Sequence, residues 1–359
     1  MEVAELTHKE FLKIHKDPEK AARAADLLYV SDAQPGISRT KKGSGFSYSF
    51  NNKIIRDKTQ LERIRKLAIP PAWTNVWICP SENGHIQATG LDVRGRKQYR
   101  YHAAWHNVRN ETKFHRMYEF GKALPTLRLR VEQDICGADH SERKVLATLV
   151  SLMERTFIRV GNAGYEKMYG SYGLTTLKDG HVNIKGSTLS FSFKGKKGIE
   201  HNITLRSKRL ARIVQACKDI SGKELFQYYD EDGNRKSVDS GMLNSYIREA
   251  TGQDFTAKDF RTWAGTLAML QTLKSAGEAT TESDYKKNIV AALDEVSKKL
   301  GNSRAICKKY YVHPGLLRMY EENNLAKHLN ELDKIEECDN KTDLTEEEKV
   351  LMKILEKLK

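Results

Sequence analysis

The order of apolar and polar residues divides the chain into a strand-rich first part and a helical second part. Up to about residue 110, short apolar or alternating segments lie between Gly, Asn and Pro residues, which is typical of strands. These segments are FSYSF from Phe46, VWICP, HIQATG and QYRYH. The same stretch predicts one or two short helices over 1–28, a loop over 31–45, and a helix over 57–67 that ends before Pro70-Pro71.

Beyond Trp105 the apolar spacing becomes helical. It predicts helices over 111–122, 141–160, 206–220, 238–251, 258–274, 283–300 and 315–330. Residues 174–205 interrupt this pattern with two predicted hairpins. GLTTL and HVNI flank Asp179-Gly180, which suits a tight turn, and TLSFSF and IEHNITL flank KGKKG. Together they predict a three-stranded antiparallel β-meander inside a helical lobe.

The pattern therefore predicts an α+β fold with a small strand-rich N-terminal lobe and a larger, mainly α-helical lobe that contains the meander. A chain of 359 residues is long enough for two or three domains. We expect them to span 1–110 and 111–330, with a charged helical tail over 331–359. In the tail, Thr345 and Glu348 have capping-box spacing, and the apolar face that follows is expected to pack on the body.

The charge of the chain suggests a polyanionic partner. The net charge is +14, but residues 331–359 hold ten acidic and six basic residues, so residues 1–330 carry +18. A surplus of this size on a folded body favours nucleic acid, although charge alone leaves a merely basic protein open. No apolar run approaches the roughly 18 residues of a membrane span, and the N-terminus lacks the apolar core of a secretory signal.

Several kinds of chemistry find no support in the sequence. The five cysteines are far apart and form no C-x-x-C pair, which argues against a zinc ribbon and for a reduced, intracellular protein; they are Cys79, Cys136, Cys217, Cys307 and Cys338. There is no phosphate-binding P-loop, no H-E-x-x-H and no nucleophile elbow. The acidic run 230–232 precedes Gly233-Asn234 and is expected to be an exposed turn rather than a metal site. We expect no metal and no cofactor.

Four segments of the helical lobe carry candidate chemistry. They are FIRVGN with Arg159, FKGKKG with Lys194, Lys196 and Lys197, KDFRTWAGT with Arg261, and LGNSRAICKKYYVHP with Asn302, Tyr310 and Tyr311. Each segment alone is ordinary. As a set they fit phosphodiester transesterification, in which a tyrosine attacks phosphorus, two arginines clamp the phosphate oxygens, and a lysine protonates the leaving oxygen. An asparagine amide can donate to the remaining oxygen.

With these segments in place, the sequence resembles the type IB DNA topoisomerases of the short bacterial and poxvirus kind. The resemblance extends from about Tyr29 to Asn330. In the first lobe it rests on LLYVSDAQPGISR, LAIPPAWTNVWICP and HIQATGLDVRGRKQYRYH. In the second it rests on FIRVGNAGYEKMYGSYGLTTL, SFSFKGKKGIEHN, KDFRTWAGT and LGNSRAICKKYYVHP.

The resemblance implies a role for each catalytic residue. Arg159 and Arg261 match the family's two arginines, Lys196 its general acid, and Tyr311 its nucleophile. The poxvirus and nuclear enzymes have histidine at the position of Asn302. The asparagine of this chain instead resembles the bacterial branch. Tyr310, next to Tyr311, is an alternative nucleophile. Lys194 and Lys197 are alternatives to Lys196 as the general acid.

The resemblance also implies that the partner is double-stranded DNA. Its contacts are expected at Tyr99, Tyr101, Tyr165, Arg94, Arg96 and Lys97. For Tyr99 and Tyr101, cross-strand packing inside the lobe is an equal alternative. The two lobes of such enzymes close on the duplex as a clamp, the tyrosine forms a 3′-phosphotyrosyl bond, and the cut strand swivels and is rejoined without ATP or metal. A monomer is expected, located in the cytoplasm and at the nucleoid if bacterial, with no membrane or nucleotide partner.

Three other functions remain as alternatives at this point. A tyrosine recombinase uses the same chemistry, but Lys258 stands where its H-x-x-R histidine is usual, and its first lobe is helical. A catalytically silent DNA-binding clamp would form no covalent adduct with DNA. A metal-dependent nuclease built on Asp230 and Asp232 would be sensitive to EDTA.

Overall fold

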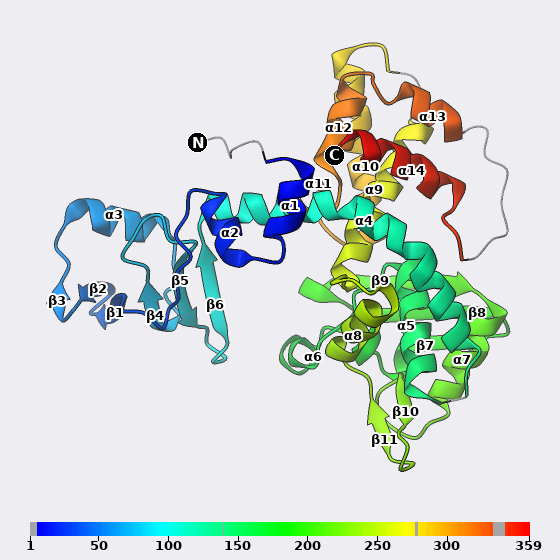
Figure 1. Cartoon of the computed structure of the whole chain (residues 1–359). Coiled ribbons are helices and arrows are strands. Elements are labelled where there is room, and N and C mark those ends of the chain that lie inside the picture. Colours follow the sequence, from blue (N-terminus) through cyan, green and yellow to red (C-terminus); the bar gives the residue numbers. More distant parts are fainter. Residues whose placement is uncertain (1–5, 139, 277–278, 333–341) are drawn as a thin grey trace. The chain divides into compact units, whose positions relative to one another are not determined.

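The structure, a computed structural model, describes residues 6–138, 140–276, 279–332 and 342–359. The chain forms two compact units, Met1–Arg116 together with Lys359, and Met117–Leu358. The expected α+β class is confirmed, with a strand-rich first unit and a larger helical second unit that contains a three-stranded antiparallel sheet (Figure 1). The domain limits at 110 and 330 stay a prediction.

The first unit is built on a six-stranded antiparallel sheet with the order β3-β2-β1-β4-β5-β6. Its elements are α1 (His8–Ile14), α2 (Pro18–Arg23), β1 (Ile37–Lys42), β2 (Gly45–Phe50), β3 (Lys53–Ile54), α3 (Lys58–Lys66), β4 (Thr74–Ile78), β5 (Ile86–Leu91), β6 (Lys97–Tyr101) and the start of α4 (Ala103–Ile135). Asp57 caps α3, whose Ile64 packs on the sheet with Ile37 and Ile78. A second cluster joins α1 and α2 to Trp105 at the start of α4.

The predicted loop over 31–45 is wrong in part, because β1 occupies Ile37–Lys42. The strand lies inside the sheet, paired with β2 and β4. Only Ile37 of the six residues is buried, so the sequence ISRTKK shows no apolar alternation from which a strand can be predicted.

The second unit is mainly helical (Figure 1). Its elements after α4 are α5 (Glu142–Thr156), α6 (Ala163–Tyr169), β7 (Val182–Lys185), β8 (Thr188–Lys194), β9 (Glu200–Arg206), α7 (Lys208–Lys218), β10 (Gln227–Tyr229), β11 (Arg235–Ser237), α8 (Ser240–Thr251), α9 (Ala257–Ser275), α10 (Glu282–Leu300), α11 (Arg304–Tyr310), α12 (Pro314–Glu321), α13 (Ala326–Leu332) and α14 (Glu346–Lys357). The helix expected over 111–122 is part of the 33-residue α4, which continues through Pro125. The helix expected over 315–330 is divided into α12 and α13 where Asn323 has φ 57°.

Helix α9 lies at the centre of this unit, with 13 buried residues among its 19. A capping box between Thr256 and Asp259 fixes its first turn. The Phe120 ring of α4 packs edge-on against the rings of Phe260 and Trp263. Core packing therefore sets the positions of the buried α9 side chains, Arg261 among them.

The three-stranded meander is confirmed, but its first predicted hairpin is wrong. Strands pair in the order β7-β8-β9, and the KGKKG segment forms the β8–β9 turn as expected. Asp179-Gly180 instead begins a short 3₁₀ helix over Asp179–His181, and Leu174–Thr176 forms another. The turn before β8 is at Gly186, which has φ 57° and suits glycine.

The C-terminal helix α14 is held in the second unit by a buried ionic contact. The capping box of Thr345 and Glu348 is confirmed. The Glu348 carboxylate is 3% exposed and accepts two bonds of 2.8 Å from Arg128 of α4 and one of 3.0 Å from the Trp263 indole of α9. The expected packing of this helix on the body is confirmed for the described residues; residues 333–341 of the predicted tail lie outside them.

Two further predictions can be compared with the structure. Among the described helices, none combines the length and the apolar character needed to cross a bilayer. Cys79, Cys136, Cys217 and Cys307 carry free thiols, and Cys338 lies outside the described residues.

Candidate active site

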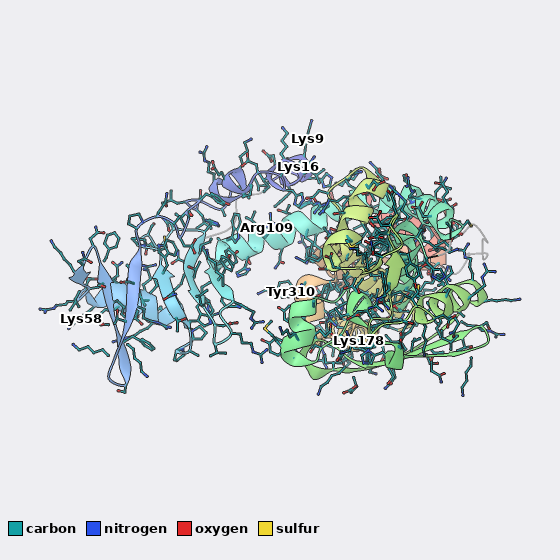
Figure 2. The ribbon with its side chains drawn as sticks, turned by 90° about the horizontal axis from the view of Figure 1, so that it is seen from below. Lys9, Lys16, Lys58, Arg109, Lys178 and Tyr310 are labelled. Atoms are coloured by element: carbon teal, nitrogen blue, oxygen red, sulfur yellow. The ribbon has the colours of Figure 1, made fainter. Side chains whose placement is uncertain are left out.

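Tyr311 lies at the junction of two helices. Ser303 caps the start of α11, and the backbone N–H of Tyr311 closes its end on the Cys307 carbonyl at 2.9 Å. Helix α12 then begins at Pro314, with His313 as its cap. The Tyr311 side chain is half-buried on this fixed turn, whereas Tyr310, labelled in Figure 2, belongs to α11 and has the Lys309 ammonium 5.5 Å from its ring centre.

One face of α9 contacts the Tyr311 turn. The guanidinium carbon of Arg261 lies 5.1 Å from the centre of the Tyr311 ring. One helical turn later, a Cβ placed on Gly265 would be 2.6 Å from the Tyr311 carbonyl oxygen, so only glycine fits there. Thr266 follows, and its hydroxyl lies 3.2 Å from the same carbonyl and accepts a bond of 3.1 Å from the His313 N–H.

Arg261 is fixed by backbone carbonyls rather than by carboxylates. It is 7% exposed, and its two terminal nitrogens donate to the carbonyls of Phe157 (2.6 Å) and Leu300 (2.7 Å). Phe157 ends α5 in the left-handed conformation with φ 56°, an unusual state for a phenylalanine. The Arg261 Nε finds no hydrogen-bond partner among the described residues, so one buried donor remains for an added anion.

Arg159 is half-buried near Arg261 and contacts Asn302. Its terminal nitrogen donates to the Asn302 side-chain oxygen at 2.6 Å and to the Gly301 carbonyl at 3.1 Å. The Asn302 amide nitrogen donates to the Leu300 carbonyl at 3.3 Å, and the same carbonyl accepts from Arg261. Residues 300–302 therefore supply hydrogen-bond acceptors to both arginines.

Arg159 and Arg261 are close enough for their positive charges to oppose each other. Burial, followed by the charge of Arg261, lowers the pKa of Arg159 to about 10. Burial also raises the pKa of the Cys307 thiol to about 11, although both arginines act against this rise, so Cys307 is an inert thiol. Two neighbouring guanidinium groups that have no carboxylate partner among the described residues are suited to a phosphate.

Lys196 is exposed at the β8–β9 turn. The Gly195 N–H donates to the Ile199 carbonyl at 2.7 Å and closes this turn, in which Lys197 has φ 64°. The Lys196 ammonium lies 5.9 Å from the ring centre of Tyr165, which is on α6 and stacks on Tyr169 at 5.7 Å. Lys194 and Lys197 are exposed as well.

The structure thus brings Arg159, Arg261, Asn302 and Tyr311 together and places Lys196 beside Tyr165. The sequence analysis missed two residues of this site, Gly265 and His201. The spacing of four between Arg261 and Gly265 was the available signal for Gly265, since residues four apart share a helix face. No pattern in the sequence distinguishes His201, which belongs to the segment IEHNITL.

Two tyrosines of the first unit lie side by side on strand β6. Tyr99 and Tyr101 lie on one face of β6, with stacked rings 5.7 Å apart, as the strand alternation predicts. Tyr99 is 44% exposed, whereas burial raises the pKa of Tyr101, which packs beside the α1–α2 cluster. Tyr99 is therefore the more accessible of the two.

The basic residues around the β5–β6 turn differ in their surroundings. Arg96 donates to the Asp92 carboxylate and holds the pKa of that carboxyl at about 2, and Lys97 pairs with Asp32 at 2.6 Å. Arg94 is exposed at the turn itself. Lys9, Lys16 and Lys58 also extend outward from this unit (Figure 2). The exposed cations among these residues are of the kind that contacts phosphates, whereas Arg96 and Lys97 are already paired with carboxylates.

No group of three or more metal-ligating side chains occurs in the described part of the chain. Residues 230–233 form the turn between β10 and β11, where Asp230 accepts from Asn234 and Gly233 has φ 76°. The expected exposed turn is confirmed.

The chain resembles known proteins over most of its length. Residues 102–337 match the family model described as eukaryotic DNA topoisomerase I, catalytic core, and residues 45–92 match bacterial DNA topoisomerase IB, N-terminal domain. DNA topoisomerase 1B of Acanthamoeba polyphaga mimivirus is 37% identical over 297 residues, which cover 80% of this chain and 88% of the viral protein. DNA topoisomerase I of Monkeypox virus is 23% identical over 286 residues, covering 77% of this chain and 87% of that protein.

Proposed function

The chain belongs to the type IB DNA topoisomerases, and from this premise we propose that it relaxes positive and negative supercoils through a 3′-phosphotyrosyl intermediate, without ATP or metal. The single observation that carries the proposal is the position of the Arg261 guanidinium over the Tyr311 ring, beside Arg159 and Asn302.

In the proposed reaction the Tyr311 hydroxyl oxygen attacks a backbone phosphorus as its proton leaves. Arg159 and Arg261 stabilise the charge that develops on the non-bridging oxygens, because two preorganised guanidinium forks replace a metal ion there. The Asn302 amide adds a neutral donor after it exchanges its weak 3.3 Å bond to Leu300 for the phosphate.

Lys196 acts as the general acid. Its position on an exposed turn allows the ammonium to reach the leaving 5′-oxygen and protonate it. The bond energy is kept in the phosphotyrosine, so the freed 5′-hydroxyl attacks back and rejoins the strand. Between the two steps the cut strand rotates and supercoils are released.

Each unit contributes DNA contacts in this proposal. Tyr99, Tyr101, Arg94, Arg96 and Lys97 serve in the first unit, and Tyr165 serves beside Lys196 in the second. Because cationic side chains displace counterions from DNA, binding should weaken steeply as salt rises. We further propose a bacterial-type monomer that works in the cytoplasm at the nucleoid; the match to the bacterial N-terminal domain and the asparagine at 302 support the bacterial type.

The test is relaxation of a supercoiled plasmid by the purified protein in EDTA without nucleotide. We expect relaxation of both signs of supercoiling by the wild type and none by Tyr311→Phe. A requirement for Mg²⁺ would instead support a nuclease, and a requirement for paired sites would support a recombinase. Tight binding without any adduct would support a silent clamp.

A further inference from the structure

His201 is a half-buried histidine of β9 that the proposed mechanism does not use. It lies opposite Phe193 of β8, and the two rings stack 5.0 Å apart at an angle of 16°. Phe193 is buried in the core of the unit, so this stacking fixes the plane of the imidazole.

The far edge of the imidazole lies against two glycines. A Cβ placed on Gly195 would be 2.6 Å from the His201 Nε2, and a Cβ placed on Gly301 would be 2.6 Å from its Cε1. Neither position has room for a side chain while the ring is present. At Gly195 the reason is space alone, because its φ of −92° is accessible to any residue.

Each of these glycines directly precedes a residue that has a role in the proposed reaction. Gly195 directly precedes Lys196, the proposed acid. Gly301 directly precedes Asn302, and its carbonyl accepts a bond from Arg159. The imidazole therefore separates and aligns the lysine turn and the loop that holds the phosphate-binding arginine.

A neutral ring is suited to this place. Burial, followed by the charges of Arg159 and Arg261, lowers the pKa of His201. An uncharged imidazole fills the space without adding a third cation beside the two guanidinium groups.

We propose that His201 is a positioning residue that sets the height of the Lys196 turn over the scissile phosphate through its contacts with Gly195 and Gly301. The inference rests on the proposed function and deepens it. Its consequence is specific: loss of the imidazole impairs protonation of the leaving oxygen, while the Tyr311 attack and DNA binding are maintained.

The test compares two leaving groups in single-turnover cleavage of a duplex that spans a site mapped with the wild type. One duplex has the normal phosphodiester, and the other has a bridging 5′-phosphorothiolate, whose sulfur leaves without a proton. We expect His201→Ala to cleave the normal duplex about 10- to 100-fold more slowly, the effect of a small misplacement of a catalytic group. The sulfur duplex should restore it to within a few-fold of wild type. In the Lys196→Ala background, His201→Ala should cause no further loss.

His181→Ala is the matched control. Its half-buried ring lies 6.3 Å from the same Phe193 and 4.3 Å from Tyr172, away from both glycines. We expect it to lose similar packing and to cleave both duplexes like wild type.

Gly195→Ala supplies a second variant if His201→Ala fails to fold. Its methyl group collides with the imidazole and so displaces the Lys196 turn. It should slow cleavage of the normal duplex and be restored to within a few-fold of wild type on the sulfur duplex. Equal impairment of His201→Ala on both duplexes would overturn the positioning role. A wild type that forms no Tyr311 adduct on either duplex would overturn the proposed function itself.

Discussion

The Arg261 guanidinium lies against the Tyr311 ring, 5.1 Å from its centre, and both of its terminal nitrogens are bound by backbone carbonyls. The arginine thus reaches Tyr311 from a buried, preorganised position, and its Nε remains for an incoming phosphate oxygen.

Arg261→Ala should slow formation of the covalent adduct by at least ~100-fold, since removal of one charge-stabilising donor costs roughly this much. Arg261→Lys keeps the positive charge but cannot span the Phe157 and Leu300 carbonyls, so we expect it to remain strongly impaired. Adduct formation is measured in a single turnover, and the melting temperature of each variant is measured beside it. A rate for either variant within a few-fold of wild type would remove Arg261 from the site.

Gly265→Ala should displace the Tyr311 turn, because its methyl group would be 2.6 Å from the Tyr311 carbonyl oxygen. We expect cleavage to slow by about 10- to 100-fold, with unchanged DNA affinity, for a misplaced nucleophile. Gly180→Ala is the control, since a Cβ there has no described neighbour within 4 Å. Equal rates for the two variants would show that the α9 face does not position Tyr311.

Lys196→Ala should lose cleavage of a normal phosphodiester and regain it on a bridging 5′-phosphorothiolate, because a thiolate leaves without protonation. Lys194→Ala and Lys197→Ala carry the same loss of charge on the same turn and should show no such selective rescue. Selective rescue of one of these two instead would move the acid to that lysine.

Glu348→Ala should destabilise the protein by about 3–5 kcal/mol, since it leaves Arg128 buried with one carboxylate fewer. Burial opposes ionisation of Glu348, but Arg128 outweighs it and the pKa lies below its ordinary 4.5. The stabilisation is therefore complete above pH 4.5 and is lost as the pH falls through the folded-state value.

Urea unfolding at several pH values checks this prediction. Glu356→Ala removes an exposed carboxylate of the same helix and should change stability by no more than about 0.5 kcal/mol. Similar losses for both variants at neutral pH would contradict the role of the buried ion pair.

Features that depend on nearby residues in the chain could be predicted from the sequence, whereas features that depend on tertiary contacts could not. The helix expected over 141–160, the α14 capping box and the alternation of Tyr99 and Tyr101 depend on local sequence, and each was predicted. Strand β1 was missed because its partners, rather than its own apolar residues, make it a strand. Asp179-Gly180 is a common hairpin turn, but the structure uses it in a 3₁₀ helix because β7 pairs with β8 through Gly186.

The candidate site likewise depends on contacts between residues that are distant in the chain. Its candidate catalytic residues come from different elements, so their spacing in the chain carries no signal, and their expected roles rest on the family resemblance. The contacts of His201 with Gly195 and Gly301 depend on tertiary packing and leave no pattern in the sequence. The spacing of four between Arg261 and Gly265 indicates a shared helix face but not the contact with Tyr311.

The most direct test of the central claim is to identify the tyrosine that bonds to DNA. The wild-type protein is trapped on a cleaved duplex and digested, and the peptide that bears the nucleotide is sequenced by mass spectrometry, with Tyr310→Phe and Tyr311→Phe analysed in parallel. The account predicts a nucleotide on Tyr311 in the wild type and in Tyr310→Phe, and no adduct in Tyr311→Phe. An adduct on Tyr310, or one that persists in Tyr311→Phe, would contradict it.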